Sequence, residues 1–168
     1  MQPRLATEST ASRRRSARAA LVAGALALLP LLAHGTEPAD EGFPRSALEI
    51  RSAAGRQWFN IRIADTEPRR ELGLMYVTHL PSDEGMLFPE DHPQVMSMWM
   101  KNTYIPLDML FIDTHGRIVC LLENAKPESL DILSCNQPAK AVLEIAGGEA
   151  QRRGIKVGDS VLHATFHK

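Results

Sequence analysis

The sequence predicts a mainly β fold, a single compact barrel-like or sandwich-like domain with one or two short helices. Short apolar segments alternate with polar residues, as in residues 57–64, where Phe59, Ile61 and Ile63 recur with the period of a half-buried strand. Seven to nine such segments are separated by turns rich in Gly, Pro and Asp. No internal repeat or low-complexity segment suggests a different architecture.

The first 35 residues are typical of a secretory signal peptide. A cluster of arginines ends at Arg18 and is followed by an apolar run over residues 19–32, which is too short to favour a membrane-spanning helix. Ala33 and Gly35 put small residues at the positions that a signal peptidase reads. We expect cleavage after Gly35 and a periplasmic or secreted protein; the alternative is an uncleaved membrane anchor.

The remaining chain divides into a flexible linker over residues 36–46 and one β-rich domain over residues 47–168. Residues 36–168 hold 14 Lys and Arg against 19 Asp and Glu, a net charge of −5 without any basic block. This balance argues against nucleic acid and against an anionic membrane surface as partners. We expect an unknown small molecule or envelope component as the partner, and no membrane span after cleavage of the signal peptide.

The elements of the first half are predicted from alternation and turn residues. Two strands at 47–51 and 57–64 flank an Ala-Ala-Gly turn. Pro68 suits the first turn of a helix over 68–76, whose Leu72, Met75 and Tyr76 recur at helical spacing and are expected to face inward. A short strand at 86–88, a proline-bounded loop at 89–93 and a strand at 95–101 follow.

The second half continues with a strand at 107–113, apolar on both faces and therefore expected inside the sheet. The segment Asp113-Thr-His-Gly116 has the residues of a β-turn and leads to a returning strand at 117–123. We then expect a long loop at 124–138, a strand at 141–145, a helical turn from Gly147 to Arg153, and a last strand at 161–166.

The segment from Met96 to Asp108 concentrates the polar chemistry of the chain. We expect a ligand-facing loop at 101–106, in which Lys101, Asn102 and Thr103 supply polar contacts and Trp99 an apolar wall. Asp108 lies on an apolar strand, where a carboxylate needs a partner, and Lys101, Asn102 and the more remote Arg69 are candidates. Two interpretations stay open: a structural polar knot that fixes the loop, or a ligand site.

Two further functions are compatible with these residues. Asp108 and Glu144, each on an apolar strand, would be the best carboxylate pair for a hydrolase. Met96, Met98 and Met100 point to one side of an extended chain, and three thioethers suit Cu(I) in an oxidising compartment, although such a stripe is more often a core face. The histidines show no metal-ligand spacing, so we expect no bound metal or other cofactor.

Cys120 and Cys135 are the only cysteines of the chain. An even count in an exported protein favours a disulfide, and a bridge between them would close the loop that carries Pro127 and Pro138. Two buried thiols are the alternative.

Several motifs, taken in order, resemble the family known as domain of unknown function 192. They are Arg69-x-x-x-Gly73-Leu-Met75, Gly85-Met-Leu-Phe88, Trp99-Met-Lys-Asn-Thr103-x-x-Pro-Leu-Asp108-x-x-Phe-Ile-Asp113, and Val142-Leu-Glu144 with Gly148 and Gly158-Asp159. The resemblance covers about residues 47–166 and implies a mainly β fold and frequent export. It implies no established activity. Met100 belongs to the family pattern, whereas Met96 and Met98 do not.

Overall fold

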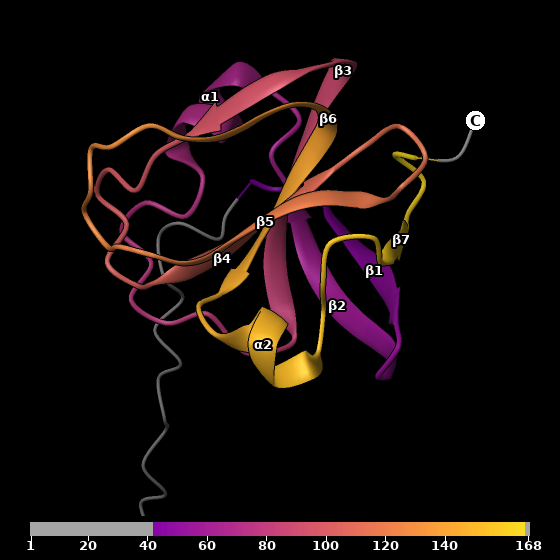
Figure 1. Ribbon diagram of the computed structural model, residues 1–168. Coiled ribbons are helices and arrows are strands. Elements are labelled where there is room, and N and C mark those ends of the chain that lie inside the picture. Colours follow the sequence, from indigo (N-terminus) through magenta and orange to yellow (C-terminus); the bar gives the residue numbers. More distant parts are fainter. Residues whose placement is uncertain (1–41, 167–168) are drawn as a thin grey trace, which may run out of the picture. The chain divides into compact units, whose positions relative to one another are not determined.

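The computed structural model describes residues 42–166, which form one seven-stranded sheet and two short helices. The strands lie in the order β5-β4-β6-β3-β2-β1-β7 (Figure 1). The elements are β1 (Arg45–Ser52), β2 (Gly55–Ile63), α1 (Glu67–Leu72), β3 (Glu84–Met98), β4 (Leu107–Ile112), β5 (Ile118–Ala125), β6 (Leu133–Ala146), α2 (Glu149–Arg153) and β7 (Ser160–Leu162). The predicted mainly β class is confirmed.

The sheet curls into a half-barrel whose two edge strands approach each other at one end. Arg117, just before β5, forms an isolated bridge with Ser160 of β7, and the Ile118 N–H donates to the Asp159 carbonyl at 3.0 Å. All strand pairs are antiparallel except β2 with β3. That parallel pair requires a crossover, and the segment containing α1 provides it.

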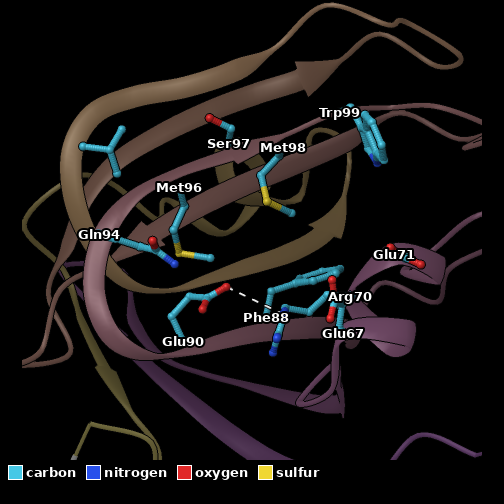
Figure 2. Close-up of a pocket in the computed structure, with 11 residues that line it drawn as sticks. Glu67, Arg70, Glu71, Phe88, Glu90, Gln94, Met96, Ser97, Met98 and Trp99 are labelled. Atoms are coloured by element: carbon cyan, nitrogen blue, oxygen red, sulfur yellow. Dashed lines mark ion pairs between the residues drawn. The ribbon is translucent and has the colours of Figure 1, made fainter.

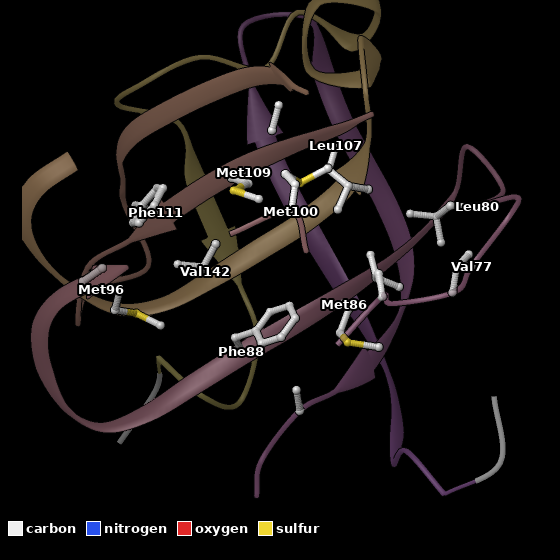
Figure 3. Packing of buried hydrophobic residues seen from close by; sticks show 14 of the residues in the cluster. Val77, Leu80, Met86, Phe88, Met96, Met100, Leu107, Met109, Phe111 and Val142 are labelled. Carbon is white, nitrogen blue, oxygen red and sulfur yellow. The ribbon is translucent and has the colours of Figure 1, made fainter. Parts of the chain in front are cut away.

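Two hydrophobic clusters occupy opposite faces of this sheet because side chains alternate along each strand. The inner cluster draws on all seven strands and includes Leu48, Ile50, Phe59, Ile61, Leu87, Leu110, Ile112, Ile118, Leu143, Ile145 and Val161. The outer cluster lies on β3, β4 and β6 and includes Met86, Phe88, Met96, Met100, Leu107, Met109, Phe111 and Val142, with Val77 and Leu80 covering it (Figure 3). Strand β4 is buried at every position, as expected for a strand inside the sheet.

The expected hairpin of β1 and β2 is confirmed, and β1 begins earlier than expected, at Arg45. The predicted signal peptide at 1–35 and most of the predicted linker at 36–46 lie outside the described residues. Within residues 42–166, no helix is long and apolar enough to cross a membrane.

The predicted helix at 68–76 is too long, because α1 ends at Leu72. Gly73 follows with a φ of 47°, which ends the helix. The residues after it therefore no longer face inward at helical spacing. As a result Leu72 is 37% exposed and Tyr76 is 52% exposed, contrary to the inward orientation expected for them. Leu74 and Val77 enter the outer cluster instead.

Two predicted loops are largely strand. Residues 86–98 belong to one long strand, β3, which bends where its register with β6 shifts between Pro89 and Gln94. Strand β6 begins at Leu133, so only residues 126–132 remain between β5 and β6 instead of 124–138. The helical turn after Gly148 is confirmed as α2, while the last strand, β7, spans only Ser160–Leu162.

Candidate functional site

A groove of about 350 Å³ lies between α1 and the second half of β3 (Figure 2). One side is formed by β3 and the residue after it, and the other by α1. The floor and walls mix apolar and charged side chains: Glu67, Arg70, Glu71, Phe88, Glu90, Gln94, Val95, Met96, Ser97, Met98 and Trp99. Its volume lies within the range of small-molecule sites.

The bend in β3 creates this groove. A register shift between Pro89 and Gln94 turns the strand away from β6, and the Lys140 ammonium donates to the carbonyls of Glu90 and Asp91, the latter at 2.9 Å. Beyond the bend, β3 pairs again with the start of β6. The groove therefore depends on contacts between segments that are distant in sequence.

Acidic groups outnumber basic ones around the groove. Of the described residues that line it, Glu67, Glu71 and Glu90 are acidic and one, Arg70, is basic; its Nε lies 3.7 Å from the Glu90 carboxylate (Figure 2). This pair is partly exposed, so its contribution to stability is small. The groove consequently favours a ligand that carries positive charge.

A narrow pit of about 30 Å³ shares five residues with the groove: Arg70, Glu71, Phe88, Met98 and Trp99. Its other walls are Leu72, Gly73, Leu74, Met75, Lys101, Thr103 and Glu144. This volume holds one or two groups of the size of a water molecule. The pit is thus a small extension of the groove that ends beside a buried carboxyl.

Glu144 is the unusual group in the pit. The residue is only 3% exposed, and it pairs across the sheet with Met86 and Met109, on the face of the outer cluster. Burial raises the pKa of its carboxyl to about 8, because the charged form loses its hydration. Within residues 42–166 this carboxyl has no hydrogen-bond or ion-pair partner. Because its pKa is about 8, it is mainly an uncharged acid at neutral pH.

Asp108 is fully buried and its carboxylate is held by three backbone N–H groups. Oδ1 accepts from Asn124 at 2.8 Å and from Gly148 at 3.0 Å, and Oδ2 accepts from Ala150 at 2.9 Å. The structure therefore favours the polar knot, but with partners other than the expected Lys101, Asn102 and Arg69. Asp108 joins β4 to the end of β5 and to the first turn of α2.

The proposed catalytic pair of Asp108 and Glu144 is wrong. Asp108 has no exposed surface, and its neighbours on the strand, Leu110 and Ile112, belong to the inner cluster. Glu144 instead lies on the outer face. A hydrolase of this kind needs both carboxyl groups open to one cleft.

Of the other residues predicted from the sequence, some line the groove or the pit and one holds the loop in place. Trp99 is half exposed and lines both groove and pit, and the Lys101 ammonium lies 5.6 Å from the centroid of its ring. Thr103 lines the pit and its hydroxyl donates to the Lys101 carbonyl at 3.3 Å. Asn102 instead fixes the loop, donating to the Tyr76 hydroxyl at 3.0 Å.

Arg69 lines neither cavity; its guanidinium pairs at 2.6 Å with Asp65, which lies just before the helix. The neighbouring Arg70 is the arginine that faces both. Arg70, Phe88 and the acidic groups of α1 were not predicted from the sequence as site residues. A clue was available in the spacing of Glu67, Arg70 and Glu71, which lie on one face of a helix.

The methionine stripe is divided between core and groove. Met96 and Met100 are buried in the outer cluster, whereas Met98 is only partly buried; Met96 and Met98 line the groove. Met100 faces neither cavity. The three thioethers therefore do not face one site, contrary to the copper interpretation, and their main role is packing.

The predicted Cys120–Cys135 disulfide is present, with a Cα–Cα distance of 6.2 Å. It joins β5 to the start of β6, next to the residues that pair with Ser97 and Met98. Disulfides are typical of proteins outside the reducing cytosol.

The chain is similar to a family described as uncharacterised and to a solved protein of unknown function. Residues 49–163 match the family DUF192, described as Uncharacterized ACR. No curated protein matches the chain. A solved structure from Sinorhizobium meliloti 1021, whose description proposes a transcription regulator, is 37% identical with a TM-score of 0.72, and the match covers 74% of this chain and 97% of that one. A protein of unknown function from Novosphingobium aromaticivorans DSM 12444 is also 37% identical with a TM-score of 0.72, covering 74% and 89%.

Proposed function

Since the chain belongs to the DUF192 family, for which no activity is described, we propose its function from the groove: it is a small non-catalytic binding module. The ligand is partly apolar and lies between α1 and β3, with one polar group in the pit. The predicted signal peptide and the disulfide support a periplasmic location.

The observation that carries this proposal is the carboxyl of Glu144, a residue only 3% exposed that lines the pit beside the groove and has no partner within residues 42–166. A carboxyl without a protein partner is hydrogen-bonded by water or by a ligand. Phe88, Met98 and the half-exposed Trp99 add apolar surface beside it. A buried polar group beside such apolar side chains is typical of ligand sites.

Binding is favoured over nucleophilic catalysis because, within residues 42–166, no hydrogen bond pairs a nucleophile with a base among the side chains that line the groove and the pit. No histidine or cysteine of this described part lines either cavity, and Asp108 lines neither. The Thr103 hydroxyl donates to the Lys101 carbonyl rather than to a side-chain base. Nucleophilic catalysis requires such a base or an equivalent activating group.

The description of the Sinorhizobium meliloti structure does not lead us to propose DNA binding for this chain. Glu67, Glu71 and Glu90 place negative charge around the groove, and residues 36–168 carry a net charge of −5. DNA-binding surfaces are basic, because they neutralise phosphates.

A groove-filling variant tests the proposal. Gln94 is exposed and lines the groove, so Gln94→Trp should fill it, whereas His92→Trp changes an exposed residue of the same bend that does not line it. NMR titration with six-carbon amphipathic probes should shift the Phe88, Met98 and Trp99 amides in the wild type and in His92→Trp, but not in Gln94→Trp. Equal shifts in both variants, or none in the wild type, would contradict binding in the groove.

A further inference from the structure

We propose that the pit binds the primary amine of an unbranched alkyl chain, with the Glu144 carboxylate as its counter-ion. This inference rests on the proposed function and specifies the ligand class. The alkyl chain would lie along the groove and the ammonium would enter the pit.

The size of the pit favours an ammonium over other charged groups. At about 30 Å³ it accommodates one or two water-sized groups. An ammonium is compact, with a single heavy atom at the end of a flexible stem. A guanidinium is a planar group of four heavy atoms, so it is too large for the pit.

The walls suit the methylene groups behind the ammonium. Phe88 and Met98 line both the groove and the pit, and Leu74 and Met75 add to the pit. Alkylammonium groups such as a lysine side chain readily bury their stem along apolar surface. Trp99 can additionally contact a cation through its ring face, as its contact with Lys101 already shows.

The charged groups around Glu144 determine how strongly the pit attracts an ammonium. Arg70 and Glu71 of α1 and Lys101 of the loop after β3 also line the pit. The strands adjacent to Glu144 contribute apolar Met86 and Met109. Arg70 is engaged with Glu90, and Glu67 and Glu71 add negative charge. Lys101 is the charge that opposes an incoming amine, so its removal should strengthen binding.

Binding of the ammonium requires the Glu144 carboxyl to lose its proton. Glu144 is an uncharged acid at neutral pH, because burial raises its pKa to about 8. When the ligand ammonium enters, the carboxyl releases its proton to solvent and the resulting carboxylate pairs with the ammonium. Because most of the free acid is protonated at pH 7, binding should release most of one proton there and much less at pH 9.5.

Calorimetric titration with n-hexylamine, n-hexanol and hexanoate tests the inference. We expect hexylamine to bind the wild type at least tenfold more tightly than hexanol at pH 7. Titrations in two buffers of different ionisation enthalpy should show the released proton. Glu144→Gln should abolish both the preference for the amine and the proton release, whereas Glu123→Gln, an exposed control on β5, should change neither. Lys101→Gln should raise the affinity for hexylamine several-fold.

The outcomes separate this inference from the proposed function. If hexanol or hexanoate binds the groove as tightly as hexylamine, or if Glu144→Gln leaves the amine preference intact, the amine assignment is wrong while the binding function stands. If none of the three probes binds, the proposed function itself fails. Thermal unfolding of Glu144→Gln, an isostere of the protonated acid, confirms that the variant is folded.

Discussion

Asp108 and Glu144 lie on opposite faces of the same pair of strands. In the register of β4 and β6, Asp108 is opposite Ile145, whereas Glu144 is opposite Met109. Paired residues share a face and consecutive residues alternate, so the two carboxyl groups point into different clusters. One is held by backbone N–H groups and the other ends at the pit, which gives them separate roles that mutation can distinguish.

Replacing Asp108 should destabilise the fold strongly. Asp108→Ala leaves three backbone N–H groups, of which that of Ala150 is buried, without their acceptor, and we expect it to lower the free energy of unfolding by about 2–4 kcal/mol. Lys101→Ala removes an exposed ammonium and should change it by less than about 1 kcal/mol. Urea unfolding of the two variants measures this difference. Equal losses would indicate that Lys101 also belongs to the scaffold.

Glu144 should make stability decrease with pH. Its folded-state pKa of about 8 lies above the ordinary value of 4.5, so the native state binds more protons than the unfolded state between these values. Stability is therefore lost as pH rises from about 4.5 to about 8, by roughly 3 kcal/mol at pH 7. The difference in unfolding free energy between wild type and Glu144→Gln, followed from pH 4 to 8, should show this slope. A difference that does not vary with pH would show that the carboxyl is ionised normally.

Loss of the disulfide should destabilise the protein without changing its architecture. Cys120 and Cys135 are separated by 15 residues, and closing a loop of this length contributes roughly 3 kcal/mol. We expect the Cys120→Ala, Cys135→Ala double variant to melt several degrees lower than the wild type. Peptide mapping without reductant should recover the linked pair from wild-type protein. Two freely alkylated thiols in the native protein would contradict the bridge.

Trp99 should matter for binding more than for folding. It is half exposed and lines both cavities, so Trp99→Ala should weaken hexylamine binding about tenfold. Its effect on the unfolding free energy should stay within about 1 kcal/mol, as for other exposed sites. Trp58→Ala removes an equally exposed indole that lines neither cavity and serves as the control. Similar binding by the two variants would exclude Trp99 from the site.

The predicted signal peptide should be removed during export. The basic cluster and short apolar run at residues 1–35 predict cleavage after Gly35. Protein recovered from a periplasmic fraction should therefore have an intact mass that begins at Thr36. A membrane-bound product that retains residues 1–35 would instead support the uncleaved anchor.

Much of the fold was predictable because local pattern and turn chemistry agree with it. The hairpin of β1 and β2, the turn before β5 and the helical turn after Gly148 all follow from nearby residues. The bend of β3 was not predictable, because it depends on Lys140, far along the chain. There the proline-bounded segment predicted a loop, yet tertiary pairing made it strand.

The site was predictable only in part, for a similar reason. Trp99, Lys101 and Thr103, which were predicted as ligand contacts because they follow a strand end, line the pit. The partner helix could not be assigned, since sequence alone does not show that α1 packs beside β3. Asp108 and Glu144 looked alike in sequence, and only the register of β4 with β6 distinguishes them.

The position of the disulfide links maturation of the protein to its binding surface. Cys135 follows directly after Leu133 and Ser134, which pair with Met98 and Ser97 in the wall of the groove, and the Ser134 hydroxyl donates to the Met96 carbonyl at 2.9 Å. The covalent bond to β5 thus anchors the strand on which this wall rests. A copy retained in a reducing compartment would lack that anchor, so its groove would be less rigid until the thiols are oxidised. Under the proposed export and binding function, the groove would reach its final rigidity only after transport, when the disulfide forms.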